Sequence, residues 1–185
     1  IIGVVEEGEA LHGDRVQPGD VLLAYGSSGL HTNGYTLARR VVFDVMKLQL
    51  TDRLGDTGQS VADSLLAVHQ SYSRAVMPVI TRLHGIAHIT GGGIPGNLVR
   101  ILPDQCTAMV ETGSWKWPPL FHLLQEAGKV SLDEMRDVFN LGVGLIAVLP
   151  RTAVEEVQSA ARNAGVPTWV LGEIRRGPTE VRFTT

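Results

Sequence analysis

Three consecutive glycines at positions 91–93 are the feature that most restricts how this chain can fold. They follow a short apolar run that ends at Thr90, and Pro95 comes soon after them. Glycine lacks a Cβ, so the backbone here can adopt positive φ and approach a ligand closely. Proline suits the first helical turn, because the N–H that it lacks has no intrahelical partner there. We therefore predict a strand over residues 86–90, a tight turn, and a helix that reaches about residue 102.

A turn of this kind is also suited to binding an anion. Free backbone amides and the positive end of a helix dipole together attract negative charge. We predict a phosphate in this turn, with His88 and Thr90 as flanking donors. The alternative is a plain strand-to-helix turn without a ligand. Three adjacent glycines cost backbone entropy that a plain turn does not require, which favours the phosphate.

Composition excludes several classes of protein. The chain has 185 residues, and a domain of this size buries roughly 70% of the surface that its unfolded chain exposes. A formal net charge of −3 gives no general attraction to nucleic acid or to an acidic membrane surface. The sequence contains no apolar run that approaches the ~20 residues of a membrane span. The single Cys106 fits a reducing compartment and is expected to be a small buried hydrophobe, so we expect a cytoplasmic protein.

Apolar runs and segments of helical period alternate along the chain without a strict strand–helix–strand rhythm. We predict strands at residues 1–7, 20–25, 86–90, 105–111, 145–149, 168–174 and 180–183. We predict helices at residues 35–47, 61–68, 72–84, 120–127, 131–139 and 152–164, besides the one that follows the glycines. This order indicates an α+β fold, a mixed sheet with helices packed on it, in a single domain spanning residues 1–185. The strand-like start without methionine leads us to expect an excised piece of a longer chain.

A second loop rich in glycine and hydroxyl groups, residues 26–34, separates the predicted strand at 20–25 from the helix that follows. His31 stands in this loop, and an imidazole of near-neutral pKa can bind phosphate or transfer a proton. His31 and His88 both lie at the ends of predicted strands. Loops at one edge of a sheet commonly build one site. We therefore expect these two histidines to converge on one cleft, the alternative being that His31 is scaffold.

A dinucleotide-binding pattern, G-x-G-x-x-A, occurs at residues 142–147. That pattern indicates a nucleotide site only where it follows a strand and opens a helix. Here it precedes an apolar strand that stops at Pro150, so we reject it as a nucleotide site.

Five short motifs lie in a characteristic order along the chain: GDVLL at 19–23, GSSGLHTNGY at 26–35, AHITGGG at 87–93, FNLGVG at 139–144 and LGEI at 171–174. Each motif alone is weak, but five in register are specific. Together they make the whole chain resemble the C-terminal domain of the phosphoribosylformylglycinamidine cyclo-ligase family, the aminoimidazole ribonucleotide synthetases.

The resemblance implies a three-layer α/β/α domain that forms the C-terminal half of a two-domain, homodimeric ligase. It implies ring closure of formylglycinamidine ribonucleotide with ATP and Mg²⁺, giving aminoimidazole ribonucleotide, ADP and phosphate in purine biosynthesis. In that family most ATP and Mg²⁺ ligands belong to the N-terminal domain, which this chain lacks. No residue of this chain is therefore assigned to a cofactor or to a metal, and neither nucleic acid nor membrane is an expected partner.

Carried over position by position, the resemblance gives catalytic roles to His31, His88 and Asn33. It gives substrate-binding roles to Ser27, Ser28, Gly29, Thr90, Gly91, Gly92 and Gly93. Asn140, Gly142 and Gly144 match a later glycine motif that we interpret as mainly architectural.

The chain departs from the family pattern at Val68-His69-Gln70, where the family usually has proline, threonine and arginine. An arginine can bind phosphate through two parallel hydrogen bonds, and Gln70 cannot replace its charge. Either that arginine is peripheral, or this chain handles substrate differently, or His69 substitutes for it.

Two other classes of function compete with the ligase half. One is a phosphate-ester binding module without chemistry, because the chain shows no complete set of acid, base and nucleophile. The other is a sister enzyme of the same superfamily, such as the amidotransferase that makes the formylglycinamidine substrate, or a kinase that forms selenophosphate or thiamine phosphate. Assays of ring closure and of alternative acceptors with ATP separate the three.

Overall fold

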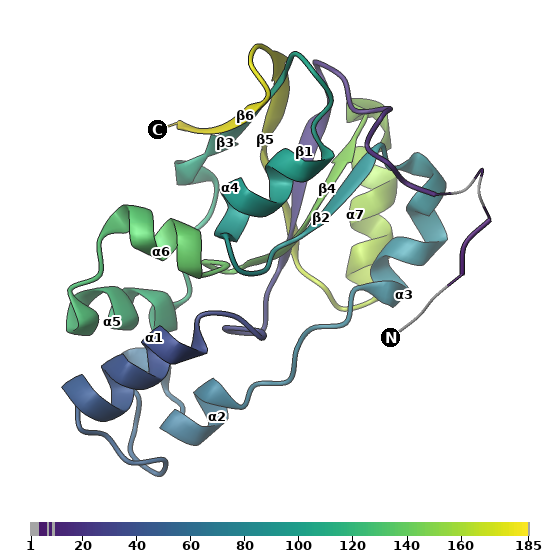
Figure 1. The fold of residues 1–185 in the computed structure, drawn as a ribbon. Coiled ribbons are helices and arrows are strands. Elements are labelled where there is room, and N and C mark those ends of the chain that lie inside the picture. Colours follow the sequence, from purple (N-terminus) through teal and green to yellow (C-terminus); the bar gives the residue numbers. More distant parts are fainter. Residues whose placement is uncertain (1–3, 7, 9, 185) are drawn as a thin grey trace.

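The computed structural model describes residues 4–6, 8 and 10–184 of the chain. Six strands form one sheet in the order β2-β4-β1-β5-β3-β6 (Figure 1). Their bounds are Val21–Gly26 (β1), Gly85–His88 (β2), Cys106–Glu111 (β3), Val143–Leu149 (β4), Thr168–Arg176 (β5) and Glu180–Thr184 (β6). Neighbouring strands pair antiparallel except β3 and β6, which are parallel, so the predicted mixed sheet is confirmed.

Two sequence predictions about strands have clear outcomes. The strand predicted at residues 1–7 falls partly outside the described residues, and residues 4–6 form no strand. The glycines at 142–144 lead directly into β4 rather than into a helix, which confirms that they are no dinucleotide-binding turn.

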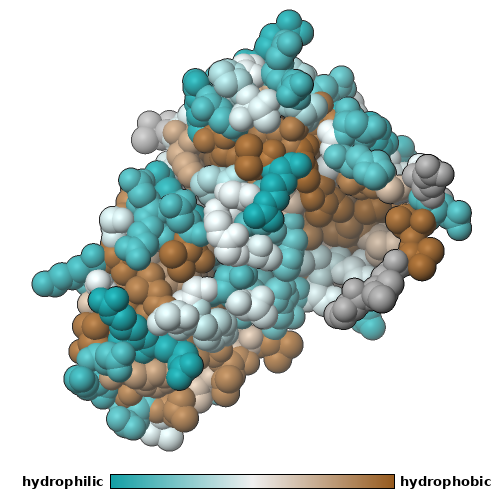
Figure 2. All heavy atoms as spheres, in the orientation of Figure 1, coloured by the Kyte–Doolittle hydropathy of each residue, from teal (hydrophilic) through white to brown (hydrophobic). Residues whose placement is uncertain are grey.

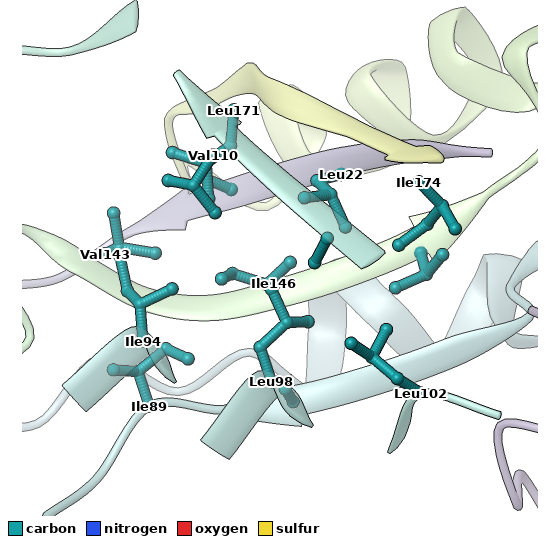
Figure 3. Packing of buried hydrophobic residues seen from close by; sticks show 14 of the residues in the cluster. Leu22, Ile89, Ile94, Leu98, Leu102, Val110, Val143, Ile146, Leu171 and Ile174 are labelled. Carbon is teal, nitrogen blue, oxygen red and sulfur yellow. The ribbon is translucent and has the colours of Figure 1, made fainter. Parts of the chain in front are cut away.

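The two central strands, β1 and β4, are buried on both faces. Successive side chains of a strand point to opposite faces of its sheet. Leu22 of β1 and Ile146 of β4 accordingly belong to one apolar cluster, whereas Leu23 of β1 belongs to another. The first cluster is covered by α4, which contributes Ile94 and Leu98 (Figure 3). The second is covered by α3 and α7, so the predicted layers of helix, sheet and helix are present.

Most helices are shorter than predicted, whereas α5 extends one residue beyond the predicted 120–127 at each end. The bounds of the helices are Tyr35–Arg39 (α1), Val61–Leu65 (α2), Ser73–Val76 (α3), Gly93–Leu98 (α4), Pro119–Gly128 (α5), Leu132–Val138 (α6) and Val154–Asn163 (α7). No helix within the described part of the chain combines the length and the apolar character needed to cross a membrane.

Several predicted helices change type along their length, two of them over six residues each. The one predicted at 35–47 is α-helical only through α1 and continues as a π-helix over Arg40–Val45. The one predicted at 72–84 is α-helical only in α3 and continues as a 3₁₀-helix over Met77–Arg82. Pro78 explains this second change, because proline has no N–H for the hydrogen bond of an α-helix interior.

The helices α1, α2, α5 and α6 gather beyond one end of the sheet around a third apolar core (Figure 1). Phe121 of α5 and Phe139, next to α6, meet edge to face in it, with ring centroids 5.8 Å apart. The hydroxyl of Ser131 accepts a hydrogen bond from the amide of Glu134 and caps α6 at the predicted start of that helix. Apolar side chains remain exposed over this group as well as beside the sheet (Figure 2).

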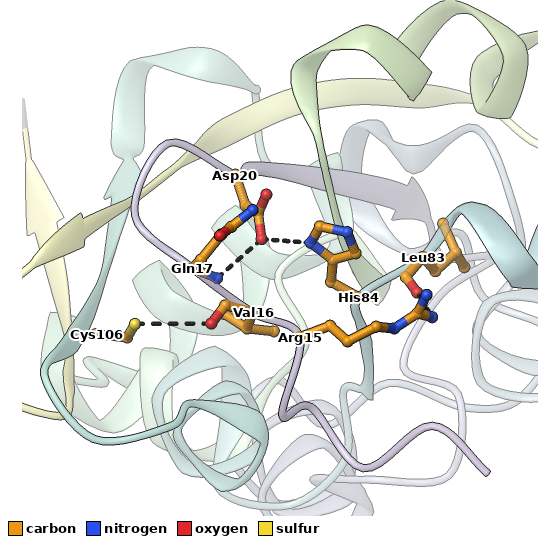
Figure 4. Close-up of polar contacts among 7 residues, drawn as sticks. All are labelled: Arg15, Val16, Gln17, Asp20, Leu83, His84 and Cys106. Carbon is orange, nitrogen blue, oxygen red and sulfur yellow. Dashed lines mark hydrogen bonds and ion pairs between the residues drawn. The ribbon is translucent and has the colours of Figure 1, made fainter. Parts of the chain in front are cut away.

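Buried polar contacts fix the segment that leads into β1 (Figure 4). The Asp20 carboxylate accepts a hydrogen bond from the Gln17 amide at 3.0 Å and meets Nδ1 of His84 at 2.7 Å. Cys106 is buried beside the carbonyl of Val16, as expected for a small hydrophobe. This packing sets where β1 enters the sheet and therefore where the loop that follows it emerges.

Candidate functional site

The loop over residues 27–34 leaves the sheet at the end of β1 and is anchored by one buried side chain. Asn140 accepts hydrogen bonds at its Oδ1 from the Ser27 hydroxyl at 2.9 Å and from the Gly142 amide at 2.8 Å. Its Nδ2 donates to the carbonyl of Gly29 at 2.8 Å. Asn140 thus joins two of the sequence motifs, which supports the architectural role that the sequence gives it.

Three histidines from three separate segments meet beside this loop. His31 is 4% exposed and adopts a positive φ of 57°. The His69 ring stacks on it, with ring centroids 3.9 Å apart and planes 20° from parallel. Nε2 of His69 lies 3.2 Å from Nε2 of His88, which ends β2 and is exposed. His31 and His88 therefore converge on one place, as the sequence predicts.

Contacts from the 27–34 loop carry His69 into this cluster. The Ser28 hydroxyl donates to the carbonyl of Val68 at 2.6 Å, and the Ser28 amide donates to Nε2 of His31 at 3.2 Å. The Tyr72 hydroxyl donates to the carbonyl of Gly26 at 2.8 Å. The bond from Ser28 to Val68 and the bond from Tyr72 to Gly26 tie the 67–72 connection to the end of β1 and to the loop that follows it.

Sequence reasoning missed Tyr72, and it left His69 only as one of three alternatives. The Tyr72 ring lies against the histidine cluster, with centroids 6.2 Å from His31 and 6.5 Å from His88. The signal available in the sequence was the departure from the family pattern at residues 68–70, which marks the segment that supplies His69.

Burial and neighbouring histidine charges lower the pKa values of His31 and His88. Burial, followed by the charges of His69 and His88, lowers the pKa of His31 to about 4. Burial and the charge of His69 also lower the pKa of His88. His31 is therefore neutral at physiological pH. Because the Ser28 amide donates to its Nε2, the proton of His31 is on Nδ1, which is buried and has no hydrogen-bond partner among the described residues.

The triple-glycine turn is tied into the fold by its own amides. Gly92 donates to the carbonyl of Asp137 at 2.9 Å, and Gly93 donates to that of Thr90 at 3.0 Å. The Asn97 side chain bonds to Thr90 and donates to the Gly93 carbonyl at 2.7 Å. Two of the amides on which the predicted phosphate depends are thus engaged within the chain, and the phosphate stays a prediction.

Asn33 borders the same turn. A Cβ built on Gly91 would lie 3.9 Å from Oδ1 of Asn33, so the two residues are neighbours. Nδ2 of Asn33 is buried and lacks a hydrogen-bond partner within the described part of the chain. An amide nitrogen in this state is a donor available to a ligand that enters beside Gly91.

The residues predicted to bind substrate line two adjoining surfaces rather than one. Ser27, Ser28 and Gly29 line a pocket of about 210 Å³ whose other walls include Gln59 and Leu120. The three histidines and the triple-glycine turn are not among its lining residues. Ser28 belongs to both surfaces, because it lines the pocket while its amide reaches His31.

Gly144 allows His31 and Tyr72 to pack against β4, and replacing it by alanine is expected to lower the free energy of unfolding by about 2–3 kcal/mol. The added Cβ would lie 1.9 Å from the Tyr72 hydroxyl oxygen and 2.6 Å from Cε1 of His31. Urea unfolding of Gly144→Ala in the native and Tyr72→Phe backgrounds measures this contact. The loss is expected to be smaller with phenylalanine, which lacks the nearest clashing atom. Equal losses in both backgrounds would contradict the assignment.

Comparison with known proteins identifies the family and the fold. The family described as "AIR synthase related protein, C-terminal domain" matches residues 17–184. A phosphoribosylformylglycinamidine cyclo-ligase of Sorangium cellulosum (strain So ce56) is 44% identical over 177 residues, which are 94% of this chain and 51% of that protein. The chain spans about half the length of the curated relatives that it matches.

Two solved structures share the fold. Thiamine-monophosphate kinase from Stenotrophomonas maltophilia K279a aligns with a TM-score of 0.65 and 22% identity, over 97% of this chain and 54% of that one. The hydrogenase maturation protein HypE in complex with ATP aligns with a TM-score of 0.60 and 18% identity, over 97% of this chain and 51% of that one. At these identities the likeness shows the fold alone. From the family match and the shared fold, the chain belongs to the AIR synthase related protein family, as a C-terminal domain.

Proposed function

We propose that this chain is the C-terminal half of a phosphoribosylformylglycinamidine cyclo-ligase. In the proposed reaction ATP transfers a phosphoryl group to the formyl amide oxygen of formylglycinamidine ribonucleotide. An amidine nitrogen then attacks the activated carbon, and phosphate leaves as the imidazole ring closes to aminoimidazole ribonucleotide. The observation that carries the proposal is the 44% identity to a protein of that name over 94% of this chain.

The geometry supports this function because the loops that carry the family motifs lie side by side. The 27–34 loop and the 88–93 segment meet through the histidine cluster and through Asn33 beside Gly91. We propose His31, His88 and Asn33 as the catalytic group. His88 is exposed, so its imidazole can contact a bound substrate. Neutral His31 is buried, and its ring stacks against that of His69 and holds it in place.

We propose that the substrate binds across the two adjoining surfaces. The hydroxyl-rich wall formed by Ser27, Ser28 and Gly29 suits the polar ribose and amidine groups of the substrate. The turn from Thr90 to Gly93 is proposed for its phosphate, with the unpartnered amide of Asn33 as a further donor.

ATP and Mg²⁺ are proposed to bind mainly in an N-terminal domain outside this single-domain chain. HypE, which shares the fold, has been solved in complex with ATP. Mg²⁺ prefers oxygen ligands. Within the described residues, the group of side chains close enough to hold a metal ion consists of three histidines, which do not fit Mg²⁺. We therefore derive no catalytic step from Mg²⁺ in this chain.

A cytoplasmic homodimer is the proposed form of the whole protein. Exposed apolar side chains support association, because large apolar patches on a folded domain mark interfaces. Val4 and Val5 are 99% and 61% exposed. The formal net charge of −3 gives no reason to expect nucleic acid as a partner.

The chain alone is expected to fold but to form no product, because phosphoryl transfer depends on positioned metal ions and the sequence offers no Walker-type loop and no cluster of paired carboxylates to hold Mg²⁺. The same chain joined to the proposed N-terminal domain is expected to turn over at about 1 s⁻¹ or faster. The measurement is ATP-dependent formation of aminoimidazole ribonucleotide by protein freed of host enzyme. Comparable turnover by the chain alone would show that the ATP site has been misplaced. Turnover of another acceptor in place of this substrate would point to a sister enzyme.

A further inference from the structure

We propose that His31, His69 and His88 form a binding site for a divalent transition-metal ion of the zinc class. Each of the three offers one ring nitrogen, and these nitrogens all lie within 4.8 Å of one another. The proposal concerns this chain's own side chains and does not depend on the ring-closing reaction.

The spacing of two of the nitrogens already matches a bound ion. Zinc lies about 2.0–2.1 Å from an imidazole nitrogen, so two ligands of a tetrahedral ion are about 3.3 Å apart. Nε2 of His69 and Nε2 of His88 are 3.2 Å apart. Two imidazole nitrogens at this distance either share one proton or share a metal ion. When both Nε2 atoms coordinate an ion, the proton between the two neutral rings moves to Nδ1 of its own ring, so no proton is gained or lost and no other reactant is needed.

His31 supplies the third nitrogen from the buried side of the cluster. Its Nδ1 is buried and has no hydrogen-bond partner among the described residues. Coordination through Nδ1 moves the ring proton to Nε2 and gives up the contact from the Ser28 amide, which at 3.2 Å is a long one. Nδ1 of His31, which is buried without a partner among the described residues, would bind the metal ion, and the ring would lose one weak hydrogen bond in exchange.

The two stacked rings must turn before they can point at one ion. The planes of His31 and His69 are 20° from parallel, and each nitrogen directs its lone pair within its own ring plane. His69 has room for this rotation, because it is half-buried and lies in the 67–72 connection, outside any helix or strand. His88 is exposed, so the remaining position of a four-coordinate ion faces water.

The donor set determines the class of metal. Three neutral imidazoles suit Zn²⁺, Cu²⁺, Ni²⁺ and Co²⁺, whereas Mg²⁺ and Ca²⁺ require oxygen ligands. Three protein ligands with a fourth position open are characteristic of zinc sites that bind water or a substrate. The site therefore fits an exchangeable ion that activates or orients a small polar ligand.

The test titrates the metal-stripped chain with Zn²⁺ by calorimetry and with Co²⁺ by visible absorption. We expect one ion per chain and the intense visible bands of four-coordinate Co²⁺, which Zn²⁺ then displaces. His69→Ala is expected to weaken binding by about 100-fold or more, above the ~10–100-fold that loss of an outer-shell partner causes. His12→Ala, at an exposed histidine outside the cluster, is the matched control and is expected to bind as the native chain does.

A second variant keeps the test decisive if His69→Ala does not fold. His88→Gln removes a ligand at an exposed position, and the thermal midpoint of each variant in chelator confirms that it folds. Absence of saturable Zn²⁺ binding by the native chain would overturn the proposal. So would undiminished affinity in folded His69→Ala and His88→Gln, or an equal loss in His12→Ala.

Discussion

Replacing Gly93 by alanine is expected to lower the free energy of unfolding by at least about 4 kcal/mol, a loss seen only where a substitution meets a severe structural conflict. Gly93 has a φ of 58°, which L-residues rarely adopt. A Cβ built there lies 1.7 Å from the backbone carbonyl oxygen of Arg136 in α6. Backbone cannot rotate away as a long side chain can, so α4 and α6 must separate. Urea unfolding followed by circular dichroism measures the loss.

The matched control lies three residues along the same helix. A Cβ built on Gly96 has no other atom within 4 Å, and its φ is not positive. Gly96→Ala is therefore expected to stabilise the chain by about 0.5–1 kcal/mol, because alanine has less backbone entropy to lose in a helix. If Gly93→Ala proved as stable as Gly96→Ala, the close packing of α4 on α6 would be wrong.

Replacing His88 by asparagine in the complete enzyme is expected to lower kcat by roughly 10²–10⁴-fold, the contribution typical of a general acid or base. His88 is exposed, so its loss removes no core packing, and the melting temperature is expected to change little. The measurement pairs steady-state kinetics of ring closure with thermal unfolding of the same samples. His31→Ala is expected to lower kcat as well, but with a larger loss of stability, because His31 is buried.

His12→Asn provides the control for His88→Asn, since His12 is exposed and lies outside the histidine cluster. We expect its kcat to equal that of the native enzyme. An unchanged kcat in His88→Asn would assign the cluster a role other than catalysis of ring closure. That result would say nothing about whether the native chain binds Zn²⁺, so each proposal can be contradicted without the other.

The elements that the sequence predicts best are those fixed by local chemistry. The strand, the glycine turn and the helix around residues 85–101 follow from the conformational limits of glycine and proline, and the structure confirms them. The predicted start of a helix at residue 131 is equally local, because the Ser131 hydroxyl caps α6 there. The helix predicted at 72–84 was too long, because the apolar pattern was given more weight than Pro78, which ends the α-helical hydrogen bonding.

Features set by contacts distant in sequence were predicted only in part. The approach of His31 to His88 follows from loops at the strand ends, and that part of the site was predicted. The stacking of His69 on His31 depends on the path of the 67–72 connection. Bonds from Ser28 and Tyr72 to distant carbonyls set that path, and no local propensity encodes them. For the same reason the pocket lined by Ser27–Gly29 is separate from the glycine turn, although the sequence grouped them.

The parallel pairing of β6 with β3 has a consequence for the order in which the sheet assembles. Only residues 177–179 connect β5 to β6, yet β3 lies between these two strands, so β6 does not pair with its neighbour in sequence. β3 must first pair with β5, and the paired residues are about 70 positions apart in sequence, so this pairing closes a long loop. Until that closure is complete β6 has no partner edge to join. Pairing of β6 with β3 is therefore a late event in folding. Before it, the unpaired backbone edge of β3 can pair with a strand of another chain.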